Sequence, residues 1–441
     1  MRMTPDLILH ARWIAQVEKE TPALLEGYAV AIKDGRIAAL LPSAQARAQY
    51  GACKSVELAE HLLFPGLINL HTHAAMSLMR GIADDLPLMS WLSERIWPTE
   101  QAHVSARFVR DGTRLACAEM LKGGVTCFND MYFFPEAAAE AAVEVGMRAV
   151  LGILALDFPS PYASDALDYL AKGLAARDVW KEHPRIHFCL APHSPYTVQD
   201  ASFGKIRTYA DQLELPIHLH IHETEEEIRV HRERHGVRPL ARLARLGLLG
   251  PQLIGVHAVH LDTSEIELLA RANCSIAHCP TSNLKLGSGI APVARLLESG
   301  INVGLGTDGA ASNNRLDLLA EMRLASLLAK GATHAAQNLP AWTALRMATL
   351  YGARALGLER EIGSIEAGKR ADLVAINLSA LELQPCFDPV SHLVYCAGRE
   401  HVSHVWVEGA CCVFEGQAAY ADTISLKNAR SLWQNRLSFT L

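Results

Sequence analysis

A repeated alternation of short apolar segments and longer helical segments, from about residue 65 to about residue 363, constrains the fold most strongly. Eight strand-then-helix units in about 300 residues are typical of a (β/α)8 barrel with parallel strands. An open doubly wound sheet is the alternative, and it is less favoured because no GxGxxG motif follows the first strand. The predicted barrel strands are residues 66–70, 125–129, 148–154, 186–191, 217–221, 253–257, 274–278 and 302–306.

The two ends of the chain carry shorter apolar segments that predict a second, smaller domain. Asp34-Gly35 lies between two such segments, and this pair is typical of a tight β-hairpin. Further strands are predicted at residues 7–15, 371–376 and 402–407, with a turn at Glu408-Gly409. We therefore predict an α/β protein in which residues 65–363 form the barrel and residues 1–64 and 364–441 form a small β-sandwich domain.

Charge and hydropathy exclude several classes of function. The 441 residues include 41 basic and 47 acidic side chains, well interspersed, which is unlike the basic footprint of a nucleic-acid-binding protein. No apolar run approaches the roughly 18–20 residues of a membrane span, and the first residues lack the apolar region of a secretory signal. The ten cysteines form no CxxC pair, so we expect buried thiols in a cytoplasmic protein.

Two histidines close the first predicted barrel strand. His71 and His73 are two residues apart, so in a strand both side chains point to the same face. The carboxyl end of a barrel strand faces the mouth of the barrel, where the active sites of such enzymes lie. The pair predicts either two metal ligands or two hydrogen-bonded polar residues at a strand end.

The fifth predicted strand alternates apolar residues with His218, His220 and His222. Burying three imidazoles inside a barrel is costly unless they have hydrogen-bond or metal partners. We expect His220 to be a metal ligand, and His218 and His222 to be packed through hydrogen bonds.

The sixth and eighth strands end in two further candidates, His257 and Asp308. Asp308 precedes Gly309, a pair usually found in turns, but here it ends a buried strand in register with the histidine-bearing strands. The predicted metal ligands are His71, His73, His220 and Asp308. Three histidines and an aspartate suit zinc, with ferrous iron as the alternative.

Together these strand ends resemble the amidohydrolase superfamily, whose members carry the HxH pair, two further histidines and an aspartate on strands one, five, six and eight. The resemblance covers the whole chain and implies a metal-dependent hydrolase. Binuclear members use a carboxylated lysine on strand four, and residues 187–193 contain no lysine. The resemblance therefore implies one metal ion per chain.

Residues 88–100 and 307–314 are similar to the methylthioadenosine/S-adenosylhomocysteine deaminases, whose relatives include guanine and cytosine deaminases and triazine hydrolases. By this resemblance Glu100 accepts hydrogen bonds from the ribose hydroxyls, Trp91 packs on the sugar and His193 donates to the purine. Ser312 is a further expected substrate contact. Without the resemblance, the sequence favours a different interpretation of each residue: a surface acid for Glu100, an aromatic residue packed in a lid for Trp91, and a histidine at a strand end for His193.

Three residues are candidates for catalysis. Glu223 follows His220 by three residues and could carry a proton between water and substrate, although it could also be an ordinary acid at a helix start. By resemblance His257 orients the attacking water. Asp308 would both bind the metal and accept a proton from that water.

We therefore expect zinc-dependent deamination of an adenine nucleoside to an inosine-type product and ammonia. The alternatives are guanine deamination, triazine dechlorination, or a non-catalytic metal-binding scaffold. We expect no nucleic-acid or membrane partner, and the resemblance implies a homodimer or larger homo-oligomer.

The segment after the third barrel strand indicates which nucleoside is preferred. Family members that accept S-adenosylhomocysteine well use arginines here, whereas residues 154–163 contain no Arg or Lys. Arg148 precedes the segment and could still reach the substrate. We expect 5′-methylthioadenosine to be preferred over S-adenosylhomocysteine, with adenosine also accepted.

Overall fold

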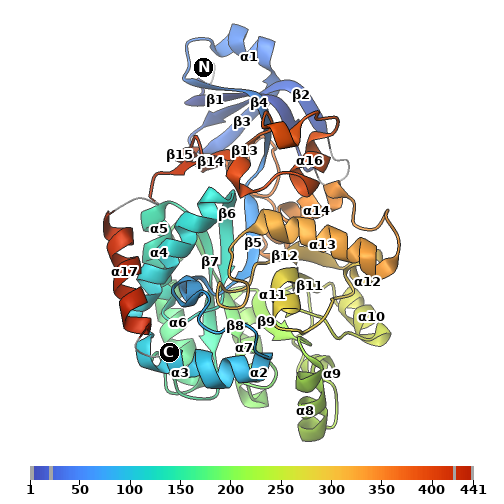
Figure 1. Ribbon diagram of the computed structural model, residues 1–441. Coiled ribbons are helices and arrows are strands. Elements are labelled where there is room, and N and C mark those ends of the chain that lie inside the picture. The colour runs from blue at the N-terminus through green and yellow to red at the C-terminus, as the bar shows by residue number, and fades with distance from the viewer. Residues whose placement is uncertain (1–3, 19–22, 421–423, 439–441) are drawn as a thin grey trace.

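The chain folds into two eight-stranded sheets, one arranged as a barrel and the other standing at one end of it (Figure 1). This computed structural model describes residues 4–18, 23–420 and 424–438. The predicted (β/α)8 barrel and the separate sheet built from both chain ends are confirmed.

The barrel sheet is parallel throughout, and its order follows the chain from β5 to β12. Every observed strand overlaps its predicted range. The strands are β5 (Leu67–Thr72), β6 (Val125–Asp130), β7 (Arg148–Ala155), β8 (Ile186–Pro192), β9 (Ile217–Ile221), β10 (Leu253–His257), β11 (Ser275–His278) and β12 (Asn302–Leu305). The helical segments between and after them are η1 (Ala74–Met79), α2 (Leu88–Ser90), η2 (Trp91–Ile96), α3 (Trp97–His103), α4 (Ala106–Lys122), α5 (Pro135–Val145), α6 (Ala166–Trp180), α7 (Asp200–Leu213), α8 (Glu225–His235), α9 (Pro239–Arg245), α10 (Thr263–Arg271), α11 (Pro280–Lys285), α12 (Val293–Glu298), α13 (Leu318–Thr333), α14 (Ala341–Met347) and α15 (Leu350–Ala355).

The last strand closes the barrel against the first through a few specific contacts. The amide of Asp308 donates to the carbonyl of His71 at 3.0 Å, and the amide of Thr307 donates to the side chain of Asn69 at 2.9 Å. At Gly306 a Cβ atom would lie 2.9 Å from the His71 nitrogen, so a larger residue would push the strands apart. Closure therefore brings the carboxyl ends of β5 and β12 together.

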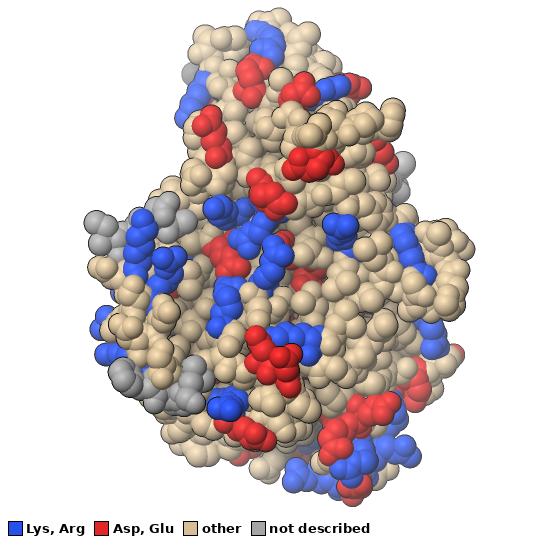
Figure 2. Space-filling model, in the orientation of Figure 1, with Lys and Arg blue, Asp and Glu red and all other residues tan. Residues whose placement is uncertain are grey.

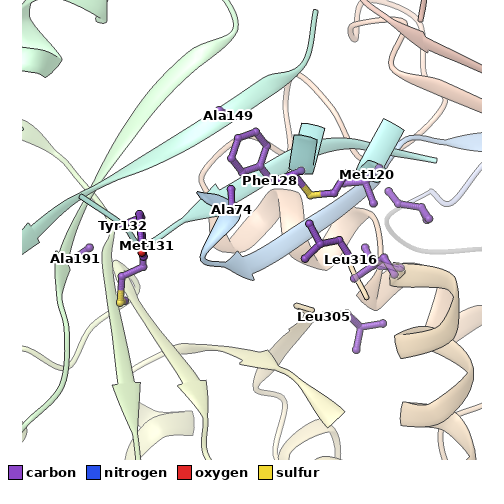
Figure 3. Packing of buried hydrophobic residues seen from close by; sticks show 14 of the residues in the cluster. Ala74, Met120, Phe128, Met131, Tyr132, Ala149, Ala191, Leu305 and Leu316 are labelled. Carbon is purple, nitrogen blue, oxygen red and sulfur yellow. The ribbon is translucent and has the colours of Figure 1, made fainter. Parts of the chain in front are cut away.

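Apolar side chains fill the space between the barrel strands and the surrounding helices. Figure 3 shows Met120, Phe128 and Leu316 among these buried residues, which belong to the largest hydrophobic cluster of the structure. Parallel strands covered on both faces have few positions for exposed polar residues, which explains why the predicted strands read as nearly continuous apolar runs.

The second sheet joins strands from the two chain ends in the order β16-β15-β14-β13-β4-β1-β2-β3. Its strands are β1 (Leu7–Ala15), β2 (Leu24–Lys33), β3 (Arg36–Pro42), β4 (Ser55–Pro65), β13 (Leu373–Asn377), β14 (Val402–Val407), β15 (Ala410–Phe414) and β16 (Gln417–Ala418). The short helices near it in sequence are α1 (Ser43–Tyr50), η3 (Leu381–Leu383), α16 (Pro389–Tyr395) and η4 (Arg399–His401). The strands form one continuous hydrogen-bonded sheet, with separate hydrophobic clusters around Leu9 and Ile8 on adjacent positions of β1.

Two features of this sheet connect to the sequence. Asp34 and Gly35 form the predicted hairpin turn, with φ angles of 49° and 74° that suit an Asp-Gly pair. The sequence analysis did not single out β4, which lies between β1 and β13 and joins the two chain ends. The domain boundaries near residues 64 and 364 stay a prediction.

The last helix, α17 (Ile424–Leu437), falls in the range 364–441 that was assigned to the small domain. It lies beside α4 on the outside of the barrel (Figure 1). The indole nitrogen of Trp433 donates to Asp111 at 2.9 Å, and its ring packs edge-on against Phe108. Residues near the C-terminus therefore contribute to the outer surface of the barrel.

Among the described residues, no helix has the length and the apolar composition that a membrane span needs. Figure 2 shows acidic and basic side chains interspersed over the face that it draws.

A buried ion pair joins the barrel to the second sheet. Arg148, the first residue of β7, donates from Nε to Asp372 at 3.1 Å and from its terminal nitrogen to Glu408 at 3.3 Å. Both Arg148 and Asp372 are almost completely buried. Removing one partner leaves the other charge without compensation, which is more costly than the pair itself is stabilising.

We expect Arg148→Met to lower the stability of the folded chain by about 3–5 kcal/mol, the range for breaking a buried ion pair. The measurement is the midpoint of urea unfolding followed by circular dichroism. Arg110→Met is the matched control, because Arg110 pairs with Glu144 on the exposed surface of the barrel. Equal midpoints for the two variants would contradict a structural role for Arg148.

Candidate metal centre and pocket

A pocket of about 420 Å³ opens at the carboxyl ends of the barrel strands. Its walls come from strand ends, from the segment 88–101 and from the loop that follows β7. The predicted site residues on the pocket wall are His73, Trp91, Glu100, His193, His220, Glu223, His257 and Asp308. His71 lies beneath them, completely buried.

Four side chains direct nitrogen and oxygen atoms toward one point. The Nε2 atoms of His71 and His73 lie 3.2 and 3.3 Å from Oδ1 of Asp308. The Nε2 atom of His220 lies 3.2 Å from Nε2 of His71. His71 and His73 are on β5 or directly after it, His220 is on β9 and Asp308 follows β12, so closure of the barrel assembles the group.

The hydrogen bonds behind these imidazoles leave their inner nitrogens free to bind a metal. Nδ1 of His73 donates to the carbonyl of Met131 at 2.6 Å, and Nδ1 of His220 donates to the carbonyl of His193 at 2.7 Å. Because a carbonyl can only accept, Nδ1 carries the proton, and Nε2 of each neutral ring has a lone pair. Lone pairs aimed at one point repel one another unless a cation lies between them. These residues therefore fit a metal ion.

The carboxylate of Asp308 is held from behind by two hydroxyl groups. Ser282 and Ser312 donate to Oδ2 at 2.6 and 2.7 Å, while the amide of Gly309 donates to Oδ1. Burial favours the neutral acid, but the close contact with the imidazoles of His71 and His73 outweighs burial and lowers the pKa of Asp308 well below its usual value. Ser312, expected as a substrate contact, is absent from the pocket wall, and its hydroxyl contacts Asp308 instead.

Glu223 and His257 lie next to the proposed metal position. Glu223 precedes α8, whose N-cap is Thr224, and its buried side chain lies on the pocket wall. Its Oε2 atom is 3.7 Å from Nε2 of His257. Burial raises the pKa of Glu223, while the neighbouring His257 lowers it. A carboxyl group with a raised pKa in a pocket can carry a proton in both directions.

The backbone is strained at two of these positions. His257 and Asp308 have φ angles of 69° and 61°, in the left-handed region that side chains other than glycine rarely adopt. Such conformations persist only where the surrounding structure enforces them, and they concentrate at functional sites. Here they turn both side chains from the strand ends into the pocket.

One wall of the pocket carries the residues expected to contact a nucleoside. Glu100 is buried in α3, and the hydroxyl of Tyr132 donates to its Oε1 atom at 2.8 Å, which leaves Oε2 to accept from a ligand. Burial raises the pKa of Glu100 to about 7, and the Tyr132 hydrogen bond opposes this rise. Burial lowers the pKa of His193 to about 3, so that ring is neutral near pH 7.

The rest of the pocket is mainly apolar. Leu156, Phe158 and Pro159 from the loop after β7 face it, and no Lys or Arg is found among its described wall residues. Tyr162 from the same segment packs against Phe134 instead. The pocket therefore offers apolar surface and acidic groups, without a cationic partner for an anionic substituent.

Arg148 is the second residue that the structure places away from the pocket. It starts β7, at the amino end of the barrel, and its guanidinium is bound by Asp372, Glu408 and the carbonyl of Pro184. These partners lie at the opposite end of the strand from the pocket, so the structure does not bring Arg148 to the site.

Three of the remaining histidines, His218, His222 and His260, are hydrogen-bonded within the barrel. Nε2 of His218 lies 3.0 Å from Nδ1 of His71 and so helps to orient a proposed ligand. His222 accepts a hydrogen bond from the amide of Leu240 at 3.1 Å, and His260 donates to the carbonyl of Ser288 at 2.7 Å. His278 is buried at the end of β11 and is absent from the pocket wall.

The sequence analysis missed Tyr132, Ser282 and Asn283. Asn283 accepts a hydrogen bond from Nδ1 of His257 at 2.8 Å. Each of the three follows a barrel strand within a few residues, so position after a predicted strand was the available signal. That position alone does not tell which neighbouring side chain a polar group contacts.

Comparisons with known proteins agree with this geometry. A 5-methylthioadenosine/S-adenosylhomocysteine deaminase of Saccharophagus degradans is 48% identical over 432 residues, covering 98% of this chain and 97% of the relative. A structure of an adenosine deaminase from Xanthomonas campestris with bound zinc has a TM-score of 0.97 at 46% identity, covering 99% of each chain.

A more distant similarity concerns the fold alone. The atrazine chlorohydrolase of Arthrobacter aurescens, in complex with zinc, has a TM-score of 0.89 at 24% identity and covers 97% of this chain and 99% of its own. Residues 62–412, most of the chain, match the amidohydrolase family. Since the match includes the whole barrel and the 48% identical relative spans nearly the full length, this chain belongs to the amidohydrolase family.

Proposed function

We propose that this protein is a zinc-dependent deaminase of adenine nucleosides, with 5′-methylthioadenosine as its preferred substrate. The convergence of three imidazoles and Asp308 beside the buried Glu223 carries the proposal, together with the names of relatives 40–48% identical to this chain. We propose His71, His73, His220 and Asp308 as ligands of one zinc ion, with ferrous iron as the alternative.

Zinc with an open coordination position lowers the pKa of a bound water molecule, typically to about 7. The chain supplies the remaining functions. Glu223 is proposed to deliver a proton to the ring nitrogen of the purine and then to the leaving ammonia. His257 orients the attacking water, and Asp308 accepts a proton from it. The reaction forms a C6–O bond and breaks the C6–N bond.

The substrate preference follows from the composition of the pocket. Glu100 is proposed to accept hydrogen bonds from the ribose hydroxyls, with Trp91 against the sugar and His193 at the purine. The apolar loop around Phe158 suits a methylthio group. A homocysteine tail ends in a carboxylate, which needs a cationic partner such as arginine. The pocket wall supplies none among its described residues.

The first prediction from the proposed function concerns metal content. We expect one zinc ion per chain, because β8 contains no lysine to bridge a second ion. The two sets of closely spaced donor atoms, His71 with His73 and Asp308 and His71 with His220 and His257, also share His71. Elemental analysis of gently purified protein measures the ratio. Two tightly bound ions per chain would contradict the single-metal centre.

The second prediction concerns Glu223. Glu223→Gln keeps the shape and removes the proton carrier, so we expect retained zinc and a loss of turnover of about 10²–10⁴ or more, as for other general acid–base groups. The matched control is Glu225→Gln, since Glu225 is an exposed acid two residues later. Normal turnover of Glu223→Gln at full zinc occupancy would show that Glu223 is an ordinary acid at a helix start and carries no proton in the reaction.

The third prediction tests the function itself. Ammonia release is compared for 5′-methylthioadenosine, adenosine, 2′-deoxyadenosine, S-adenosylhomocysteine, guanine and a chlorotriazine, with chloride release also followed for the last. We expect 5′-methylthioadenosine to have the highest kcat/KM and adenosine to be accepted. The deoxynucleoside should lose about 1.5–3 kcal/mol of transition-state binding, the value of a hydrogen bond to a charged group.

Each alternative corresponds to a different result of that comparison. Preference for guanine or the triazine would identify another amidohydrolase reaction. No turnover of any compound by zinc-loaded protein would favour a metal-binding scaffold. If S-adenosylhomocysteine is the best substrate, the argument from the apolar loop is wrong.

A further inference from the structure

The seventh barrel strand, β11, contributes no side chain to the proposed metal ligands. The short helix that follows it, α11, is near the centre of Figure 1 and packs against α13. Two adjacent residues of this helix, Ser282 and Asn283, are buried, and each contacts a site residue from a different strand. The contribution of this helix therefore needs an explanation.

Asn283 determines the state of His257. The amide oxygen of Asn283 lies 2.8 Å from Nδ1 of His257, and because it accepts, the proton lies on Nδ1. In the neutral ring Nε2 of His257 then has no proton, and it lies 3.7 Å from Oε2 of Glu223. The amide nitrogen of Asn283 is buried and has no hydrogen-bond partner among the residues described. A purely structural asparagine would pair both ends of its amide, so the contact to His257 accounts for this residue best.

Ser282 acts in the same way on Asp308. Its hydroxyl donates to Oδ2 at 2.6 Å, next to the 2.7 Å hydrogen bond from Ser312. With two donors on Oδ2, the carboxylate cannot rotate without breaking both bonds. Oδ1 is thereby directed toward His71 and His73.

The helix that carries the two residues is fixed at both ends. The amide of Thr281 donates to the buried carboxylate of Glu321 at 3.0 Å. The ammonium of Lys285 contacts Asp84 and Asn314, each at 2.6 Å. Since these partners come from three other segments of the barrel, α11 is held in one position relative to β10 and β12. Groups that orient others act best from a rigid element.

We propose that Ser282 and Asn283 are positioning residues for the reaction: Asn283 sets the tautomer and orientation of His257, and Ser282 sets the orientation of Asp308. This inference rests on the proposed function for the roles of His257 and Asp308. Neither positioning residue is on the pocket wall, so both act through the groups they hold.

Paired substitutions of Asn283 test its role in turnover. Asn283→Leu has a similar size but no acceptor, and we expect kcat to fall about 10- to 100-fold, as for other residues behind a metal site, with KM little changed. Asn283→Asp keeps an acceptor oxygen and should recover most of the loss. Equal losses in the two variants, or normal kcat in Asn283→Leu, would overturn the role of the acceptor.

Ser282→Ala tests the second contact through metal affinity rather than turnover. We expect the zinc dissociation constant, measured by chelator competition, to rise about 10- to 100-fold. The matched control is Ser326→Ala, because Ser326 is an equally buried serine whose hydroxyl donates to the carbonyl of Leu339, outside the site. Unchanged zinc affinity in Ser282→Ala, or an equal change in Ser326→Ala, would overturn the proposal for Ser282.

A measurement on the wild-type chain separates this inference from the proposed function. Nitrogen-15 spectra of histidine-labelled protein, assigned with His257→Gln, report the tautomer of His257 without any substrate. A proton on Nδ1 supports the role of Asn283, and a proton on Nε2 alone overturns it. Wild-type protein that released no ammonia from any nucleoside would reject the proposed function and leave this result unaffected.

Discussion

The contact that closes the barrel, between β12 and β5, is the constraint on which the site depends. Its hydrogen bond joins the amide of Asp308 to the carbonyl of His71, so the backbone bond that completes the fold also aligns two proposed ligands. The close approach needs Gly306, where any side chain would meet the His71 backbone. A barrel that failed to close here would separate Asp308 Oδ1 from the two imidazoles that now lie 3.2 and 3.3 Å away. The geometry of the site therefore depends directly on the contacts that close the barrel at this edge.

Each proposed ligand is in turn held by a group from another strand end. His73 is fixed by the carbonyl after β6, His220 by the carbonyl after β8, and Asp308 by a hydroxyl from α11. These supports act in a buried, low-dielectric setting, where a correctly paired polar group is stabilised and an unpaired one is costly. Such contacts fix the orientation of the proposed ligands, which reduces the reorganisation that binding requires.

At the amino end of the barrel, opposite the pocket, the buried contacts stabilise the fold. There the buried pair of Arg148 and Asp372 connects the barrel to the sheet formed from both chain ends. On the outer surface of the barrel, the C-terminal helix is attached separately through Trp433 and Asp111 on α4. Barrels of this kind separate their functions in this way, with active sites at the carboxyl ends of the strands. The loops around the pocket can therefore change specificity without altering the supports at the other end.

The sequence by itself determined the barrel, its eight strands and the identity of the groups that meet at its mouth, because strand periodicity and strand-end position are local properties of the chain. It also indicated an apolar segment after β7, since composition needs no coordinates. It could not decide the partners of Arg148 and Ser312, which depend on how β7 meets the second sheet and how the loop after β12 turns back on itself. The contacts from Tyr132 to Glu100 and from Asn283 to His257 could not be predicted from the sequence either. Side chains 26 or 32 residues apart in the chain meet only because a closed barrel brings every strand end to one place.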